Sequence, residues 1–304
     1  MEIISGTKDF YISSPTAVAI GKFDGVHIGH QRLLMEIAEK GLKSCIFTFD
    51  PAPSVFFGKE KSLLTTKKEK RILLERKGID ILVEFPFDAE TAATKPEAFL
   101  DDIVVGKMGA SLIAAGEDLS FGKKGEGNSA LLKKYGLENG LDIRVIDKLK
   151  VRIGDGNEEY EVSSTLIRDM ILYGKMEEAE QLLGIPYFIF GTVVHGNHMG
   201  SGLGFPTINL IPEDDKLLPP NGVYTSDVII GGKKYRGLTN IGTKPTVSDK
   251  GIRGVETYIY DYDSDAYGME AELYLKSFRR PEMKFSSVDE LKDRLMKDIS
   301  ENRK

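Results

Sequence analysis

Short apolar runs alternate with helix-forming segments throughout the first half of this 304-residue chain. The runs have the texture of buried strands and occur at 17–20, 43–49, 79–85, 111–115 and 141–147. Between them, apolar residues recur at helical spacing over 29–40, 66–77, 96–105 and 128–137. Thr66 and Glu69 make a capping box at the start of one of these helices. Because strands that alternate with helices form parallel sheets covered on both faces, the first half predicts an α/β domain.

The pattern changes after Gly184-Ile185-Pro186. Two further helical stretches, 164–173 and 176–183, lead up to this point. Strand-like runs follow it at 187–194, 223–230, 233–238, 255–260 and 269–275, and Gly231-Gly232 predicts a two-residue hairpin turn. A second domain, an antiparallel barrel or sandwich, is therefore expected. The boundary divides the chain into domains 1–184 and 185–304.

The last stretch predicts a helix that closes the second domain. Ser287 and Glu290 form a capping box, and an apolar stripe follows at helical spacing. The stripe consists of Val288, Leu291, Leu295 and Ile299. We expect it to lie on the barrel.

The composition is that of a globular protein, with 41% hydrophobic and 29% charged residues. A net charge of −6 and a pI near 5.5 argue against affinity for nucleic acid or anionic lipid, so neither partner is expected. The single cysteine, Cys45, excludes an intrachain disulfide and a thiolate zinc cluster. No run has the apolar length to span a bilayer, and the first residues lack a basic region followed by an apolar stretch. A soluble cytoplasmic protein is expected.

Three patterns imitate binding motifs. Residues 116–124, GEDLSFGKK, approach a P-loop, but five residues separate the glycines and no Ser or Thr follows the lysine. Residues 261–272 nearly spell a calcium loop, but the glycine at the sixth place is missing and the flanks alternate as strands. A polar hairpin loop is the better interpretation. His27 with His30, and His195 with His198, could each begin a zinc site, but each pair would need a third ligand.

The decapeptide GKFDGVHIGH, residues 21–30, joins the apolar run at 17–20 to the helix expected over 29–40. His27 and His30 sit where that helix begins. A helix N-terminus offers unpaired N–H groups and a positive dipole end, so this turn predicts an anion site. The tetrapeptide HIGH is a signature of nucleotidyltransferases, which include class I aminoacyl-tRNA synthetases. A synthetase is normally larger and carries a KMSKS loop, which this chain lacks.

Four motifs in order make a wider match. They are GKFDGVHIGH, TFDPAPSVFF at 48–57, GEDLSFGKKGEG at 116–127 and SSTLIR at 163–168. In this order they resemble the adenylyltransferase module of prokaryotic bifunctional riboflavin kinase/FAD synthetases. The resemblance implies a Rossmann-like nucleotidyltransferase domain, in which the FMN phosphate attacks the α-phosphorus of ATP and pyrophosphate leaves. Because no protein nucleophile is required, catalysis consists of alignment and charge stabilisation.

The resemblance also implies roles for individual residues of this domain. His27 and His30 are expected to be catalytic and to hold the triphosphate together with the helix N-terminus. Asp118 and Phe121 are expected to bind flavin. The other ATP- and phosphate-binding residues expected here are Gly21, Phe23, Asp24, Gly25, Ser164, Thr165 and Arg168.

The second half carries its own match. GTVVHGNHMGSGLGFPTINL at 191–210 resembles the riboflavin kinase motif, whose core is G-F-P-T-x-N. Further family matches are NGVYTSDV at 221–228, NIGTKPTV at 240–247, VETYIYDYD at 255–263 and FRRPEMKF at 278–285. The resemblance implies that Thr207 and Asn209 bind ATP and Mg²⁺, next to a glycine-rich loop that contains Gly200 and Gly204.

Glu256 and Arg280 complete this second set. By the resemblance, Glu256 is the general base for the ribityl 5′-hydroxyl of riboflavin, whereas the residues alone would make it a solvent-facing strand carboxylate. Arg280 is expected on a loop that closes over flavin and nucleotide.

These observations predict a bifunctional, magnesium-dependent enzyme that uses ATP twice. Riboflavin would become FMN in the C-terminal domain, and FMN would become FAD in the N-terminal domain. Lys22, Ala52, Leu119 and Ser201 stand where the family usually has Asn, His, Phe and Arg. These departures leave two alternatives open: a flavin-binding regulatory paralogue with one or both activities lost, and an enzyme that adenylylates another phosphorylated substrate.

Overall fold

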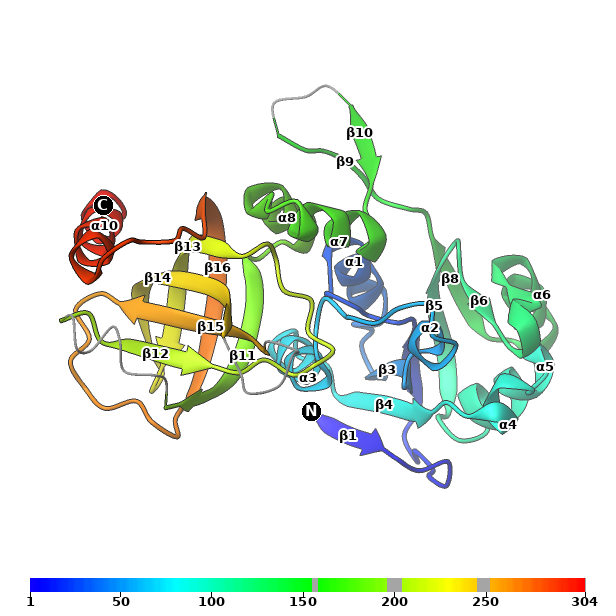
Figure 1. Cartoon of the computed structure of the whole chain (residues 1–304). Coiled ribbons are helices and arrows are strands. Elements are labelled where there is room, and N and C mark those ends of the chain that lie inside the picture. Colours follow the sequence, from blue (N-terminus) through cyan, green and yellow to red (C-terminus); the bar gives the residue numbers. More distant parts are fainter. Residues whose placement is uncertain (155–157, 196–203, 245–251, 304) are drawn as a thin grey trace. The chain divides into compact units, whose positions relative to one another are not determined.

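The computed structural model of the chain describes residues 1–154, 158–195, 204–244 and 252–303. It divides into two compact units (Figure 1). The first contains Met1–Leu63, Lys70–Arg152 and the segment that ends at Ser163. The second contains Ser164–Lys304 and also Leu64–Glu69, a segment that is distant from it in sequence.

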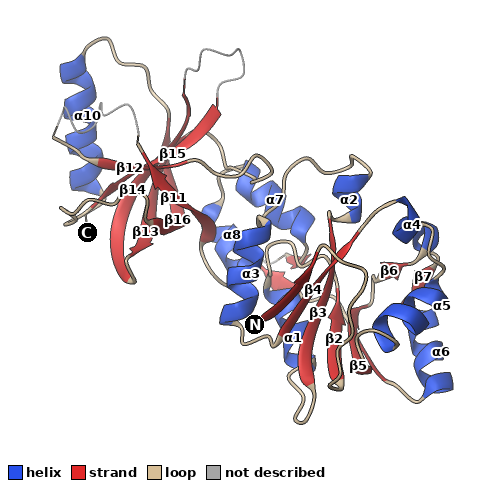
Figure 2. Cartoon of the chain, turned by 90° about the horizontal axis from the view of Figure 1, so that it is seen from below, coloured by secondary structure: helices blue, strands red, loops and turns tan. Residues whose placement is uncertain are grey.

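The first unit is built on a six-stranded parallel sheet with the order β1-β4-β3-β2-β5-β8, and Figure 2 shows β2 to β5 side by side. Its strands are β1 (Glu2–Ser5), β2 (Thr16–Ile20), β3 (Lys43–Asp50), β4 (Ile81–Pro86), β5 (Ala110–Gly116) and β8 (Asp142–Ile146). All five strands expected in this half are confirmed. The sequence did not predict β1, because it is a four-residue edge strand with little buried surface.

Both faces of this sheet are buried. Val18 and Ile20 pack with Phe99 and Leu132 in one core cluster, whereas Ala17 and its neighbours on the opposite face are equally buried. This two-sided burial explains why the strands form continuous apolar runs in the sequence. The helices of the unit are α1 (Ile28–Glu36), α2 (Pro53–Phe56), α4 (Ala89–Ala92), α5 (Pro96–Ala98), the π-helix η1 (Phe99–Val105), the 3₁₀-helix η2 (Lys123–Gly125) and α6 (Ser129–Asn139). The small strands are β6 (Ser120–Phe121), β7 (Gly127–Asn128), β9 (Lys150–Arg152) and β10 (Glu159–Glu161).

Two helices of the first unit differ from expectation. The helix predicted over 29–40 ends at Glu36. The helix predicted over 96–105 divides into α5 and η1, whose π-type hydrogen bond runs from the Gly106 N–H to the Asp101 carbonyl at 2.9 Å. A Cβ at Gly106 would lie 2.8 Å from that carbonyl, so this close turn requires glycine. Helical periodicity alone does not reveal such a change of hydrogen-bonding pattern.

At strand β2 the order in which successive strands are added to the sheet reverses. β3 and β4 lie on one side of it, and β5 and β8 lie on the other. In sheets of this type, ligands bind outside the carboxyl ends of the strands at such a switch point. The residues that leave β2 and β5 there are Gly21–His30 and Glu117–Asp118.

The second unit is a closed barrel of six antiparallel strands with the order β11-β12-β15-β14-β13-β16. The strands are β11 (Tyr187–Val194), β12 (Thr207–Leu210), β13 (Gly222–Ile230), β14 (Lys233–Lys244), β15 (Ile252–Ile259) and β16 (Glu270–Pro281). The expected antiparallel architecture is confirmed as a barrel. Only β12 was missed as a strand, because it spans just four residues.

Two helices that precede the barrel in sequence pack against each other, and the second of them contacts the barrel. They are α7 (Ser164–Leu172) and α8 (Met176–Leu183), and α8 contacts β11 and β16. Gly184 ends α8 with a φ of 77°, a conformation that glycine adopts without strain. Within the described parts of the chain, no helix combines the length and apolar character needed to cross a membrane.

The last helix, α10 (Val288–Glu301), forms as predicted but packs differently. Ser287 caps it, and the Glu290 carboxylate bonds to Ser286 rather than back to Ser287. The expected apolar stripe is only partly buried, since Val288 is 63% exposed. Polar contacts also hold the helix: buried Asp298 accepts from Arg280 at 2.9 Å, and the Tyr260 hydroxyl donates to the Ile299 carbonyl. The predicted apolar contact with the barrel is therefore confirmed only in part, at Ile299, which packs against Val223, Leu238 and Tyr260.

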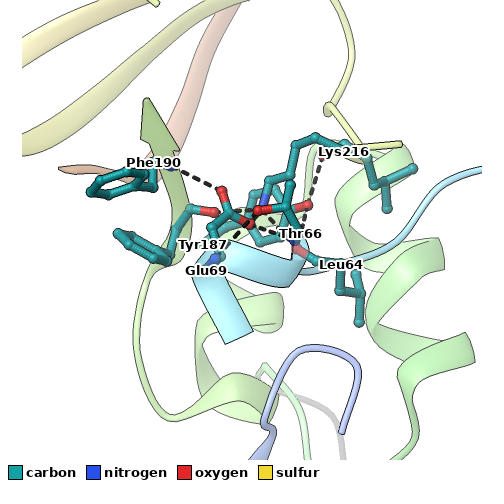
Figure 3. A network of polar contacts seen from close by, with 8 residues as sticks. Leu64, Thr66, Glu69, Tyr187, Phe190 and Lys216 are labelled. Atoms are coloured by element: carbon teal, nitrogen blue, oxygen red, sulfur yellow. Dashed lines mark hydrogen bonds and ion pairs between the residues drawn. The ribbon is translucent and has the colours of Figure 1, made fainter. Parts of the chain in front are cut away.

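Within the second unit, the segment Leu64–Glu69 is fixed by a buried polar network (Figure 3). It includes the start of α3 (Lys67–Arg76), whose capping box of Thr66 and Glu69 is confirmed. The Lys216 ammonium lies 2.7 Å from the Glu69 carboxylate, and both side chains are fully buried. The Tyr187 hydroxyl donates to the carbonyls of Leu64 and Leu217. A segment from the first half of the chain is thus an integral part of the barrel unit.

Candidate active sites

The turn between β2 and α1 has an unusual backbone. Phe23, Gly25 and Val26 have φ values of 50°, 85° and 44°. Such a conformation costs on the order of 1–3 kcal/mol at a non-glycine residue, so it persists only where the surroundings enforce it. The side chains of Phe23 and Val26 are buried and anchor the turn. Strain of this kind is concentrated at functional sites.

His27 and His30 lie together at the start of α1. The N-cap residue of the helix is His27, whose Nδ1 accepts a hydrogen bond from the backbone N–H of His30 at 3.2 Å. The two imidazole rings stack with their centroids 3.6 Å apart. A Cβ at Gly29 would lie 3.2 Å from the His27 ring, so the glycine of HIGH leaves room for this stack.

Both imidazoles are neutral at pH 7. Burial lowers the pKa of His27 to about 4, and burial, with the positive charge of Lys70 as a smaller cause, lowers the pKa of His30 well below its usual value. Because Nδ1 of His27 accepts a hydrogen bond, its proton resides on Nε2, which can donate. Nδ1 of His30 is buried without a hydrogen-bond partner among the described residues. The pair can therefore offer hydrogen bonds to a phosphate, but not a formal positive charge.

Charged groups flank the histidine pair on two elements. The Lys70 ammonium of α3 donates to the carbonyl of Lys22 at 2.9 Å, and the Thr48 hydroxyl donates to the same carbonyl. Asp118, which follows β5, interacts electrostatically with His27 and lies 3.7 Å from Lys148. A cation from α3 and a carboxylate that follows β5 thus lie near the turn.

Most of the site residues expected in the first unit lie at or near the turn between β2 and α1. Gly21, Phe23, Asp24 and Gly25 form the turn itself, and Asp24 is buried. Phe121, expected to bind flavin, is only 4% exposed and packs against Phe99 in the core. Its flavin contact stays a prediction.

Ser164, Thr165 and Arg168, the expected phosphate ligands from SSTLIR, lie at the start of α7. Contacts assign this helix to the second unit, so the first unit does not contain the whole expected set. Their role in adenylyl transfer stays a prediction.

The barrel brings Thr207, Asn209 and Glu256 together on neighbouring strands. The Thr207 hydroxyl donates to the Glu256 carboxylate at 2.6 Å, and Asn209 pairs directly opposite Glu256 in the β12–β15 register. Alternate residues of these strands, including Ile208 and Val255, are buried on the other face. Three hard oxygen donors therefore converge on one face of the sheet.

The remaining residues expected in the second unit are more dispersed. Gly204 has a φ of 88°, as a glycine-rich loop requires, whereas Gly200, Ser201 and His198 lie outside the described residues. Arg280 lies in strand β16 and not on a loop, and its guanidinium is bound by Asp298 of α10. The expectation that Arg280 sits on a closing loop was wrong, because β16 continues six residues beyond the predicted strand end at 275.

The imitated motifs resolve into ordinary structure. The calcium-like segment 261–272 includes the connection from β15 to β16, and its last three residues belong to β16. The hairpin interpretation was wrong, because β15 pairs with β12 and β14 whereas β16 pairs with β11 and β13. Part of the P-loop-like segment 116–124 forms β6, which pairs with β7. The His195 ring stacks on Tyr267 with centroids 3.7 Å apart. Among the described residues, no cluster of three or more His, Cys, Asp and Glu side chains is arranged to hold a metal ion.

Sequence reasoning missed Lys70 and the pair of Glu69 with Lys216. The run of charged residues from Lys67 to Lys70 carries no sign of a distant partner in the sequence. Glu69 and Lys216 are 147 residues apart, so no local pattern could have paired them.

The fold and these two sites define a class of protein: an α/β nucleotide-binding unit of the HIGH type joined to an antiparallel barrel with a Thr-Glu site. Comparisons with known proteins specify it further. A family model described as FAD synthetase matches residues 10–165, and one described as riboflavin kinase matches residues 183–304. Both matches follow the order of the motifs.

Curated relatives match almost the whole chain. A protein of Listeria monocytogenes is 36% identical over 98% of this chain and 94% of its own length. One from Escherichia coli K12 is 36% identical over 92% of this chain and 90% of its own length. Both are named bifunctional riboflavin kinase/FMN adenylyltransferase. A crystal structure titled macrolide-efflux protein, from Streptococcus pneumoniae, is 31% identical and covers 99% of this chain and 98% of its own, with a TM-score of 0.86. The chain belongs to the bifunctional riboflavin kinase/FMN adenylyltransferase family.

Proposed function

We propose that this chain makes FAD from riboflavin in two ATP-dependent steps. The barrel unit phosphorylates riboflavin to FMN, and the site at the HIGH turn adenylylates FMN to FAD with release of pyrophosphate. The observation that carries the proposal is the match of both family models to one chain, each over a region with its own convergent site.

For adenylyl transfer, an oxygen of the FMN phosphate forms a bond to the α-phosphorus of ATP while the bond to the β-phosphate oxygen breaks. His27 and His30 donate hydrogen bonds to the phosphates from the strained turn. Preorganised donors act on charge that develops in the transition state, so the rigidity of the turn is part of the catalysis. Ser164, Thr165 and Arg168 supply further hydroxyl and guanidinium donors.

For phosphorylation, the 5′-hydroxyl oxygen of riboflavin attacks the γ-phosphorus of ATP, and ADP leaves. Glu256 accepts the hydroxyl proton, and the hydrogen bond from Thr207 fixes the orientation of its carboxylate. Thr207 and Asn209 are hard oxygen donors on the same face, which fits Mg²⁺, since this ion takes few protein ligands beside substrate phosphates. Bound there, Mg²⁺ would neutralise phosphate charge.

We assign adenylyl transfer to domain 1–184 and phosphorylation to domain 185–304, although the second compact unit also contains Leu64–Glu69 and residues 164–184. The small-molecule partners are riboflavin, FMN, FAD and ATP. A cytoplasmic location and the lack of nucleic-acid and membrane partners stay predictions.

The test is to incubate the protein with riboflavin, ATP and magnesium chloride and to separate the flavins by chromatography, with EDTA as the control. FMN and FAD should both appear, and neither should form with EDTA. Unchanged riboflavin, together with unchanged FMN in a second incubation, would indicate the regulatory paralogue. FMN formation without FAD would favour a different phosphorylated substrate at the HIGH turn.

A further inference from the structure

Lys70 lies beside the histidine turn, although nothing in the sequence marked it as functional. Its ammonium is 2.9 Å from the carbonyl oxygen of Lys22, the second residue of GKFDGVHIGH. The Thr48 hydroxyl, at the carboxyl end of β3, donates to the same oxygen at 3.3 Å. Lys70 is therefore anchored at the edge of the sheet where ligands of this fold bind.

The chemistry at this edge requires positive charge. Two phosphate-bearing molecules must approach each other, and the two imidazoles are neutral because burial lowers their pKa values. The carboxylates of Asp24 and Asp118 lie in the same turn and after the neighbouring strand, and they add negative charge. Lys70 is a cation close enough to act electrostatically on His30.

We propose that Lys70 is a phosphate-binding residue of the adenylyl-transfer site, with its ammonium bound to the triphosphate of ATP and to the pyrophosphate product. This inference rests on the proposed function and extends it to a residue outside the recognised motifs. An ammonium has three N–H donors, so it can bond to the Lys22 carbonyl and to phosphate oxygens together. The neutral histidines then align the phosphates, and Lys70 supplies a positive charge that the histidines lack.

A purely structural role would give a different result. If Lys70 only holds the Lys22 carbonyl in the strained turn, a neutral donor at this position should serve nearly as well. Lys70→Gln keeps an amide donor without the charge, Lys70→Arg keeps the charge, and Lys70→Met removes both. Lys134→Met is a matched control, because Lys134 is an exposed lysine of the same unit on α6, paired with Glu138.

The experiment is titration calorimetry with inorganic pyrophosphate on the full chain, which needs no turnover. The Kd should rise about 10- to 100-fold in Lys70→Gln and Lys70→Met, the range expected for one lost charge-assisted bond, and stay near the unaltered value in Lys70→Arg and Lys134→Met. The KM for ATP in FAD formation should rise in parallel, while riboflavin phosphorylation by the same preparations stays unchanged.

Equal pyrophosphate affinity in the unaltered protein and in the two neutral variants would overturn the proposal. So would a loss in Lys70→Arg as large as that in Lys70→Gln, because the charge would then not be the cause. The proposed function fails separately: it fails if the unaltered protein makes no FAD from FMN and ATP, whatever the pyrophosphate titrations give.

Discussion

The carboxylate of Glu69 and the ammonium of Lys216 form a fully buried ion pair at 2.7 Å. Backbone groups satisfy the rest of both charges: Lys216 donates to the carbonyls of Leu64 and Phe188, and Glu69 accepts from the N–H of Phe190. A buried charge is tolerated only with such partners, since its desolvation is unfavourable by several kcal/mol. The pair therefore ties the start of α3 to strand β11 and to the segment before β13.

Breaking this pair from one side should destabilise the protein strongly. Glu69→Gln and Lys216→Met should each lower the free energy of unfolding by about 3–5 kcal/mol, because each leaves the other charge buried and unpaired. The double variant contains no buried charge, so its loss should be much smaller than the sum of the two. Urea unfolding of all four proteins measures the coupling. Additive losses would show that the two charges do not depend on each other.

In an isolated barrel fragment, Lys216→Met should stabilise the protein, whereas in the full chain it should destabilise it. A fragment of residues 185–304 contains Thr207, Asn209 and Glu256, so it should make FMN from riboflavin and no FAD. It lacks Glu69, which leaves Lys216 without its carboxylate. Lys216→Met should therefore raise the thermal midpoint of the fragment while lowering that of the full chain. A lower midpoint in both would mean that Lys216 contributes mainly through packing.

The main strands could be predicted from the sequence because both faces of the first sheet are buried, so that runs such as Ala17–Ile20 carry a continuous apolar signal. The four-residue strands β1 and β12 are too short to show a period. The π-helix depends on an i to i−5 hydrogen bond at Gly106, which helical spacing does not distinguish from the ordinary one.

The candidate sites were predictable where they are local. GKFDGVHIGH is one continuous turn, and His27 contacts His30 through a single helical turn. Lys70 and the Glu69–Lys216 pair depend on contacts between segments that are distant in the sequence, which no local pattern shows. Arg280 was misplaced because a strand that extends into a polar stretch gives no signal beyond its apolar part.

Flavin phosphorylation should depend on Glu256. Glu256→Gln preserves the shape of the side chain and removes the proton acceptor, so FMN formation should fall by about 10²–10⁴ in kcat. Adenylylation of supplied FMN should continue. Glu270→Gln, at an exposed strand position, is the control and should leave both rates unchanged. Unchanged FMN production by Glu256→Gln would show that Glu256 is a solvent-facing carboxylate without a catalytic role.

Acid should destabilise the first unit through its buried histidines. The pKa of His27 is about 4 in the folded protein and near 6.5 when unfolded. Between these values the unfolded chain binds a proton that the folded chain does not, so stability falls as the pH drops from 6.5 toward 4, by about 1.4 kcal/mol per pH unit for one such group. Urea unfolding at pH 7, 6 and 5 should show a shallower loss in His27→Gln. If the free energy of unfolding fell equally with pH in the unaltered protein and in His27→Gln, the lowered pKa of His27 would not be the cause.

FAD formation should depend on His30, whose ring stacks on His27 and lies against Phe23 of the strained turn. In the proposed reaction, a neutral imidazole in this position would donate a hydrogen bond to the reacting phosphates, and removal of one preorganised donor typically lowers the rate by about 10²–10³. His30→Ala should therefore lose most FAD synthesis from supplied FMN, whereas riboflavin phosphorylation in the barrel should proceed at the unaltered rate. Chromatography of flavins from the same reaction reports both steps, so the kinase rate is an internal control for folding. FAD synthesis near the unaltered rate would remove His30 from the catalytic site and leave it as a packing residue of the turn.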